Sequence, residues 1–156
     1  MAKSKENMIR IELNRLNDAF HFSASNENGN SVQLDAALDI GGTNQGMRPM
    51  QMLLAAMGGC SAIDIINILK KQRQDLKDMK ITVTGEREKD AVPSLYQTVH
   101  AHFQLFGDLD REKVEKAINL SIDKYCSVSH TLAKAGAEIT HSFEIIPVNQ
   151  RQNIDS

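Results

Sequence analysis

The sequence predicts an α+β fold, in which strands and helices occupy separate stretches of the chain. Apolar and polar residues alternate near the N-terminus, which is typical of half-buried strands. A long apolar segment follows, and a one-sided helix comes later, between two further sets of strands. The expected order is three strands, a helix, two strands, two helices and a last strand. Such segregation is unlike the regular alternation of a doubly wound sheet.

The first three strands form an antiparallel meander. Asn28-Gly29, between the second and third strands, is a strong signal for a hairpin turn. The apolar positions that alternate with polar ones in the three strands are Ile9, Ile11 and Leu13, then Phe20, Phe22 and Ala24, then Val32, Leu34 and Ala36.

A helix is predicted from Pro49 to about Arg73. Proline suits the first position of a helix, because the missing N–H would be unpaired there anyway. The segment is apolar on nearly every side, which is typical of a buried helix. At its centre lies GGC, Gly58 to Cys60, although a glycine inside a helix costs about 0.5–1 kcal/mol relative to alanine. The glycines serve either as a packing seam of small residues or to let another helix, a subunit or a substrate come close.

The second half of the chain continues with two strands, around Met79–Val83 and over Tyr96–Phe106. A helix capped by Asp108 or Asp110 follows and ends near Cys126, and a short third helix stops at Gly136, a natural C-terminal cap. The last strand contains Ile139, Phe143 and Ile145. With no repeat and no linker, residues 1–156 form a single domain, with a frayed or disordered tail over about 148–156.

Composition excludes several classes of function. Hydrophobic residues make up 41% of the chain and the net charge is −2, so nothing favours an electrostatic nucleic-acid binder. Aromatic residues are only 4%, which disfavours a stacking platform for single strands. The charged N-terminus lacks the apolar region of a secretory signal, and no uninterrupted apolar run reaches the ~20 residues of a membrane span. A cytoplasmic protein without nucleic-acid or membrane partners is expected.

Two cysteines, Cys60 and Cys126, carry the candidate chemistry. In a cytoplasmic chain they are more often free thiols, catalytic groups or metal ligands than a structural disulfide. Each could also be inert, since free cysteine is among the most buried residue types. Zinc is disfavoured because, although Cys126 and His130 could share a helical face, no pair has the usual ligand spacing. A cysteine–histidine hydrolase would need a nucleophile signature that neither cysteine carries.

The remaining possibility for the pair is dithiol redox chemistry. A thiolate attacks the O–O bond of a peroxide and becomes a sulfenic acid, which a second thiol converts to a disulfide. The attacking thiol needs a lowered pKa, usually from a nearby cation. Asp64, one helical turn after Cys60, would raise the pKa of that thiol if ionised and close.

Three segments resemble the OsmC-like family, which comprises osmotically inducible protein C and the organic hydroperoxide resistance (Ohr) proteins. They are RPMQMLLAAMGGCSAIDIINILKKQRQD (48–75), TGERE (84–88) and DKYCSVSHTLAKAGAEITHSFEI (123–145). The GGCSAID and KYCSV segments are most similar to the YhfA-like branch. The resemblance implies antiparallel sheets packed on two central helices, in an intertwined homodimer with sites at the subunit interface.

The resemblance also implies an activity, that of a peroxiredoxin-like hydroperoxide reductase without metal or other cofactor. Cys60 would react with an organic or inorganic hydroperoxide to give a sulfenic acid. Cys126 would resolve it as a Cys60–Cys126 disulfide, which an unknown dithiol reductant reopens. The alternative on the same fold is a non-catalytic dimer that binds a small ligand or senses thiol redox state.

Peroxidase members of the family orient the thiolate with an arginine that is paired with a glutamate just after the helix-opening proline. In this chain Gln51 stands where the YhfA-like branch tends to have the glutamate, and glutamine forms hydrogen bonds without carrying charge. The candidates for the arginine are Arg15 in the first hairpin, Arg48 and Arg87.

Overall fold

The structure, a computed structural model, describes residues 8–149, which form two compact units. The N-terminal unit ends at Met52 and the C-terminal unit begins at Leu53, inside helix α1 (Pro49–Lys71). The order of elements is the predicted one, three strands, a helix, two strands, two helices and a strand. Of the tail predicted to fray, residues 150–156 lie outside the described residues. The prediction of a single domain stays a prediction.

The N-terminal unit contains the predicted antiparallel meander. Strands β1 (Ile11–Arg15), β2 (Phe22–Asn26) and β3 (Ser31–Leu34) pair in that order. Gly29 lies in the turn between β2 and β3 with φ of +85°, a backbone conformation that glycine adopts without strain. The Asn28-Gly29 turn signal was therefore correct.

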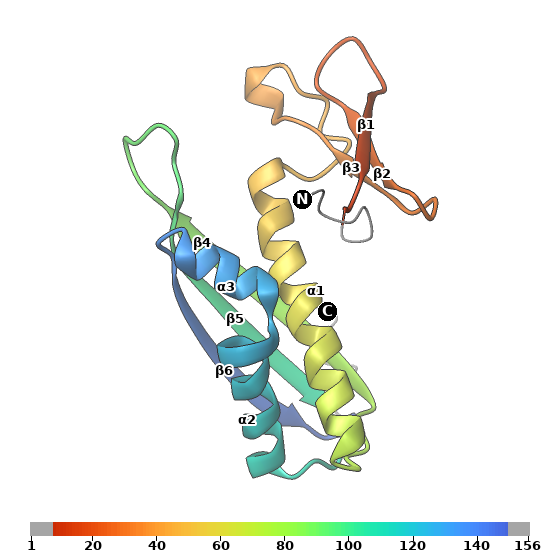
Figure 1. The fold of residues 1–156 in the computed structure, drawn as a ribbon, viewed down its shortest axis with the longest axis vertical. Helices are drawn as coiled ribbons and strands as arrows, with labels where there is room; N and C mark the ends of the chain where they lie inside the picture. The colour runs from red at the N-terminus through yellow and green to blue at the C-terminus, as the bar shows by residue number, and fades with distance from the viewer. Residues whose placement is uncertain (1–7, 150–156) are drawn as a thin grey trace, which may run out of the picture. The chain divides into compact units, whose positions relative to one another are not determined.

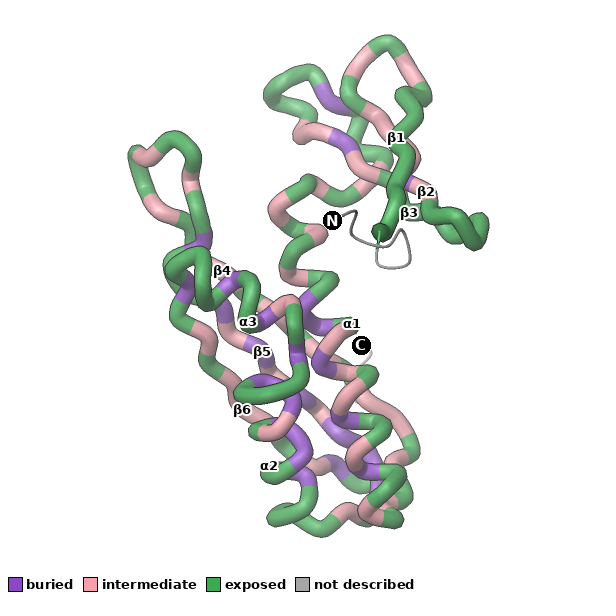
Figure 2. The backbone as a smooth tube through the Cα atoms, viewed as in Figure 1, coloured by how far each residue is buried: buried purple, intermediate pink, exposed green. Residues whose placement is uncertain are grey.

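Burial in this sheet differs from the prediction of half-buried strands. All five residues of β1 are exposed, and the side chains of Ile11 and Leu13 remain more than half exposed. Figure 2 shows the strand in the colour of exposed residues along its length. The alternation in the sequence is genuine, but within the N-terminal unit no helix packs over that face.

A carboxylate organises the loop between β3 and α1. Only 2% of the surface of Asp35 is exposed. Its carboxylate accepts hydrogen bonds from Ala36 N (2.7 Å), Thr43 Oγ1 (2.6 Å), Thr43 N (3.2 Å) and Gln45 N (3.0 Å). The Thr43 hydroxyl lowers the pKa of Asp35 to about 2, opposed by burial and assisted by the three backbone N–H groups. The loop includes a short 3₁₀ turn, Leu38–Ile40, that the sequence did not predict.

The C-terminal unit is built on a second three-stranded sheet. Strands β4 (Asp78–Arg87) and β5 (Tyr96–Phe106) are antiparallel, with bounds close to those predicted. Strand β6 (Glu138–Ile146) pairs with the other side of β5 and runs parallel to it, which corrects the expectation of wholly antiparallel sheets. The reason is the crossover, because the chain returns to the sheet through two helices rather than a hairpin.

Helices cover one face of this sheet. Helix α2 (Arg111–Leu120), helix α3 (Ser127–Lys134) and the part of α1 from Leu53 onward lie over the same side (Figure 1). Every second residue of β5 points into the resulting core, which Figure 2 shows as the main buried region. The fully buried residues of that strand are Val99, Ala101, Phe103 and Leu105.

Helix α1 is buried along one face only, not all round as predicted. The buried positions follow helical spacing, and the side chains of Ile63 and Ile66 are 65% and 46% exposed. The two glycines also differ. A Cβ on Gly58 would lie 3.2 Å from Val83 Cγ2, so this glycine lets α1 approach β4, whereas a Cβ on Gly59 would meet nothing within 4 Å. Within one chain, the glycine seam is therefore a contact between a helix and a sheet.

By length and composition alone, α1 is long and apolar enough to cross a membrane, in contrast to the estimate made from uninterrupted apolar runs. The core helix of a globular domain can have the same length and composition. Two polar residues of α1 bond to the C-terminal half of the chain, Ser61 to Cys126 and Asp64 to Ser121. The absence of a membrane partner stays a prediction.

Candidate redox site

A π-helical turn delivers Cys126 to the centre of the C-terminal unit. Helix α2 begins at the predicted cap Asp110, whose side chain accepts from Lys113 N, and ends at Leu120. The next five residues, Ser121–Tyr125, form a π-helical turn that closes with a 2.7 Å bond from Cys126 N to Ser121 O. The backbone then becomes extended at Cys126, which leaves the helix there.

Cys126 is the N-cap of α3, a role that the sequence did not predict. Its sulfur accepts from Ser129 N at 3.4 Å, as a serine or aspartate oxygen would at this position. The Ser129 hydroxyl donates to the carbonyl oxygens of Ile122 (3.1 Å) and Cys126 (3.0 Å), and so fixes the start of the helix. The Cys126 sulfur therefore lies at the positive end of the helix dipole.

Helix α1 brings Cys60 to the same place. The next residue, Ser61, is fully buried and donates from its hydroxyl to Cys126 Sγ at 3.5 Å. The Cys60 thiol itself donates to Cys126 and accepts from the backbone N–H of Val128. Both sulfurs thus occupy the N-terminal turn of α3, although Cys60 is partly exposed and Cys126 is completely buried.

The hydrogen-bond donors around the two sulfurs shift the pKa values of Cys60 and Cys126 in opposite directions. Burial opposes the ionisation of Cys126, but hydrogen bonds from the Ser61 hydroxyl, Ser129 and Cys60 outweigh it and lower the pKa of Cys126. Burial raises the pKa of Cys60. The hydrogen bond that Cys60 donates to Cys126 acts in the same direction, while the Val128 N–H opposes it. The more acidic thiol is therefore Cys126, opposite to the lowered pKa expected of an attacking Cys60.

Asp64 acts on the pair as predicted. Its charge raises the pKa of Cys60, although this is the smallest of the influences on that thiol. The carboxylate is held by the Ser121 hydroxyl, which donates to Asp64 Oδ2 at 3.1 Å. Helix α1 thus makes a polar contact from Asp64 to Ser121 in the π turn and another from Ser61 to Cys126, the residue that follows the turn.

The comparisons with known proteins now decide the family. The sequence profile of the OsmC-like proteins matches residues 42–142, more than half of the chain and including both cysteines. The chain belongs to the OsmC-like protein family. Protein YhfA of Escherichia coli (strain K12) is 48% identical over 99 residues, which are 63% of this chain and 72% of that protein.

Solved structures with the OsmC-like fold confirm the predicted fold class. A hypothetical protein from Aquifex aeolicus has a TM-score of 0.73 at 28% identity, over 90% of this chain and 98% of its own. An organic hydroperoxide resistance protein OsmC from Legionella pneumophila, also described as a predicted redox protein, has a TM-score of 0.67 over 90% of this chain and 99% of its own. At 14% identity the Legionella protein shows the shared fold alone.

The orienting residues expected from the family have other partners in this OsmC-like chain. Gln51 Oε1 accepts from Arg48 N at 3.0 Å, which is half of a capping box at the start of α1. The Arg48 guanidinium donates to Gly46 O and to Asn44 Oδ1. Both residues belong to the N-terminal unit. Their role at the thiols stays a prediction.

The other two arginine candidates donate to backbone carbonyls near their own strands. Arg15 Nε bonds to Ala19 O at 2.9 Å in the N-terminal unit. Arg87, in the C-terminal unit, donates from Nε to Ser94 O at 3.0 Å, across the loop that joins β4 to β5. Neither contact involves a sulfur, and the thiolate role of either arginine likewise stays a prediction.

Among the described residues, the hydrogen bonds of the five histidine rings do not include either cysteine. His130, the candidate zinc partner of Cys126, turns its Nε2 to the Asp123 carbonyl oxygen at 3.0 Å. Within residues 8–149 no group of three or more His, Cys, Asp or Glu could hold a metal ion. The remaining ring contacts are His21 to Gln33, His100 to Thr140 and Ser142, His102 to Ser142 and Glu144, and His141 to Asn119.

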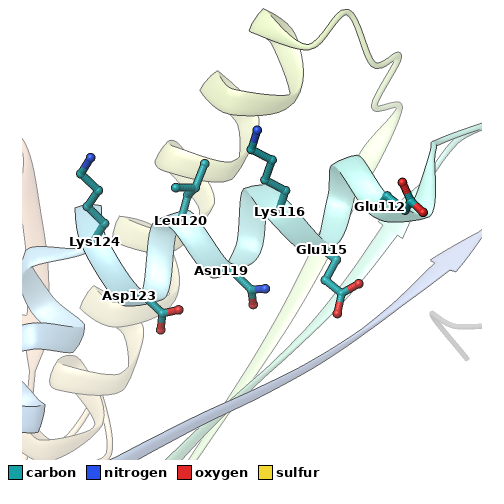
Figure 3. A pocket seen from close by; sticks show the side chains of 7 residues that line it. All are labelled: Glu112, Glu115, Lys116, Asn119, Leu120, Asp123 and Lys124. Atoms are coloured by element: carbon teal, nitrogen blue, oxygen red, sulfur yellow. The ribbon is translucent and has the colours of Figure 1, made fainter.

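A hollow lies on the outer side of α2 and the π turn, away from the sulfurs. Figure 3 shows Lys116, Leu120 and Lys124 projecting to one side of the helix in this view, and Glu115, Asn119 and Asp123 projecting to the other. It contains neither thiol, and mixed charge of this kind is typical of a solvated helix face. Its lining residues are Glu112, Glu115, Lys116, Asn119, Leu120, Asp123 and Lys124.

Sequence reasoning missed the residues that bond to the sulfurs. Ser61, Ser129 and the backbone of Val128 supply the donors, and none of them was a candidate. A signal did exist, because Cys126 is followed three residues later by Ser129, which is the spacing of an N-cap and its N3 position. Nothing in the sequence indicated that Ser61 would point to Cys126 rather than to water.

Proposed function

We propose that the chain is a cysteine-based thiol peroxidase that reduces organic or inorganic hydroperoxides. One observation carries the proposal: Cys60 and Cys126, far apart in the sequence, lie beside each other at the start of α3, where each affects the ionisation of the other and Ser61, the neighbour of Cys60, donates to Cys126 Sγ. Membership of a family whose structural relatives include a protein described as a hydroperoxide resistance protein supports the substrate class.

Cys60 is the nucleophile of the proposed cycle, because it is the partly exposed thiol and an external peroxide can approach it. Its thiolate attacks the distal oxygen, giving Cys60 sulfenic acid and an alcohol after proton uptake. Cys126 then attacks the Cys60 sulfur and displaces hydroxide, which leaves as water, and a disulfide remains. An external dithiol returns both cysteines to thiols, as a reducing cytoplasm would allow.

The proposal includes a homodimer. Within one chain, the outer face of α1 leaves Ile63 and Ile66 exposed next to the open surface at Gly59, and β1 is exposed throughout. A second copy of the chain would cover these apolar surfaces. In such a dimer, Gln51 and one of Arg15, Arg48 and Arg87 would orient the thiolate of Cys60. Sedimentation equilibrium with the Ile63→Lys variant tests the dimer, and a monomeric wild-type chain would contradict it.

The activity is tested by substitution of each cysteine. Cys60→Ser abolishes consumption of tert-butyl hydroperoxide with a dithiol reductant, because serine cannot form the sulfenic acid. Without added thiol, Cys126→Ser consumes one equivalent, and mass spectrometry then finds a sulfenic acid on Cys60 that dimedone traps. This variant turns over only when thiol is added. A matched control is Thr131→Ala, which removes an exposed α3 hydroxyl bonded only to Ser127 O. Wild-type turnover by Cys60→Ser would contradict the proposal.

A second function has a specific observation in its favour. Burial raises the pKa of Cys60, which slows attack on peroxide and suits a non-catalytic dimer that binds a small ligand or senses thiol redox state. The two functions are separated by turnover. A sensor forms the Cys60–Cys126 disulfide once after a hydroperoxide pulse and does not consume further peroxide when a dithiol is supplied, whereas the peroxidase continues.

A further inference from the structure

We infer that Cys126, in addition to resolving the sulfenic acid, accepts the proton of the Cys60 thiol during attack on the hydroperoxide, with Ser61 as the residue that positions this transfer. The inference rests on the proposed peroxidase function and deepens it. It assigns a proton acceptor to the site from residues of the C-terminal unit alone.

The two sulfurs differ in the number of hydrogen bonds donated to them. Cys126 Sγ accepts from Ser61 Oγ at 3.5 Å, from Ser129 N at 3.4 Å and from the Cys60 thiol. Cys60 accepts one hydrogen bond, from the Val128 N–H. Since hydrogen bonds donated to a thiolate stabilise it, the negative charge of a singly ionised pair resides on Cys126. The shared proton then resides on Cys60 and points at its partner.

The charges around the pair also differ between the two sulfurs. Cys126 caps α3, an eight-residue helix whose N-terminal N–H groups favour an anion there. On α1, Asp64 disfavours a thiolate at Cys60. The other ionisable groups of the neighbouring segments are exposed at the surface: Asp123, Lys124 and Tyr125 in the π turn, and His130 and Lys134 on α3. The nearby charges and the helix dipole thus favour a thiolate at Cys126 over one at Cys60, as the hydrogen bonds do.

The proposed transfer also balances the protons of the reaction. As Cys60 attacks the distal oxygen of ROOH, its proton passes to the Cys126 thiolate and the O–O bond breaks. The leaving alkoxide takes that proton from Cys126, so the products are Cys60 sulfenic acid, ROH and a regenerated Cys126 thiolate. This thiolate attacks the Cys60 sulfur and expels hydroxide. The dithiol monoanion and ROOH thereby give the disulfide, ROH and hydroxide, and Cys60 is oxidised without an added base.

Ser61 is the residue through which the arrangement can be tested. Its hydroxyl is fully buried on α1 and reaches Cys126, not the neighbouring Cys60. It contacts no reacting atom of the peroxide, so it is a positioning residue. Ser61→Ala removes one donor from Cys126 and leaves Ser129 N in place, so α3 keeps its cap.

The test is an NMR titration of the reduced chain labelled with [3-¹³C]cysteine, which reports each thiol without a reagent having to reach it. We expect the Cys126 resonance to titrate before that of Cys60. In Ser61→Ala the first step moves upward by about 0.5–1 pH unit, the equivalent of one hydrogen bond. In Thr131→Ala neither step moves. Earlier titration of Cys60, or unchanged steps in Ser61→Ala, would overturn the inference.

A kinetic measurement tests the transfer itself. In a single turnover at pH 7, Cys126→Ser is expected to form the Cys60 sulfenic acid at least about tenfold more slowly than the wild-type chain, because a serine hydroxyl cannot take the proton. Its rate should recover at high pH. An equal rate at pH 7 would mean that Cys126 only resolves. A wild-type chain that consumes no hydroperoxide refutes the proposed function, while the titration order still locates the charge.

Discussion

The loop of Asp35 and the pair of Cys60 and Cys126 each place N–H and O–H donors around an acidic group, a carboxyl in the first and a thiol in the second. Asp35 accepts four hydrogen bonds, and its pKa falls to about 2. A carboxyl group is already ionised at pH 7, so these donors only fix the loop. A thiol has an ordinary pKa near 8.5, so the donors to Cys126 determine its charge.

The comparison shows how one physical device serves structure in one region and chemistry in another. The Asp35 donors come from the loop that the carboxylate itself organises, so folding of the loop and ionisation support each other. The donors to Cys126 come from α1 and α3, two elements that are held in place by the core of the C-terminal unit. The positions of these donors are therefore set by the fold and do not depend on the charge of the thiol.

The largest expected effect on folding comes from Asp35→Ala. Removal of the carboxylate leaves the N–H groups of Ala36, Thr43 and Gln45 without their acceptor, so the thermal unfolding midpoint falls by several degrees. The matched control Asp39→Ala removes an exposed carboxylate of the same loop and leaves the midpoint unchanged. Equal midpoints for the two variants would break the comparison, because Asp35 would then not organise the loop.

Protonation of Asp35 at low pH is expected to reduce the stability of the chain gradually, and by less than the Asp35→Ala substitution. The folded pKa of Asp35, about 2, lies below its ordinary value of 3.8, so its stabilising contribution is complete above pH 4 and is lost as pH falls through 2. Denaturant titrations between pH 5 and pH 2 should show a steeper loss of stability in the wild-type chain than in Asp35→Asn. Parallel curves for the two chains would contradict the lowered pKa.

The smallest expected effect is at the thiols and comes from Asp64→Asn. The charge of Asp64 raises the pKa of Cys60, so its removal lowers that pKa and increases the thiolate fraction at pH 7. Alkylation of Cys60 by iodoacetamide, followed by mass spectrometry, should be faster by about two- to threefold, and less so in high salt. Asp123→Asn, an exposed acid of the π turn, is the control. A slower reaction of Asp64→Asn would reverse the assigned sign.

Local patterns predicted most of the fold. Alternation located β5 at its observed bounds, and Pro49 and Asp110 marked the starts of α1 and α2. The spacing of apolar residues did not predict burial correctly where burial depends on what covers the surface. The apolar residues of β1 and the outer face of α1 predict burial, but one chain leaves them exposed. The parallel β5–β6 pair depends on long-range topology, which no local pattern contains.

At the candidate site, the sequence and the resemblance identified the two cysteines, and Asp64 was placed correctly one turn from Cys60. The acidities were not predictable, because they depend on contacts between residues far apart in the chain. Ser61 reaches Cys126 across two helices, and the Ser129 N–H is a backbone group that any residue would supply. The Ser61 contact leaves no pattern in spacing or composition, whereas the cap leaves only the three-residue spacing from Cys126 to Ser129.

The π turn before Cys126 has a further consequence for how mutations act at this site. Each residue of an α-helix advances the chain by about 100°, and a π turn holds one residue more than the α-helical turn it replaces. If all five residues of Ser121–Tyr125 wound as a regular α-helix instead, the following cysteine would be rotated by about that angle, and its sulfur would move out of phase with Ser61. Deletion of one of the five would remove the extra residue and return the cysteine to nearly its present phase. The alignment of Cys126 with Ser61 therefore depends on the winding of this segment, and a shift in helical phase can disrupt the site with every named side chain still present.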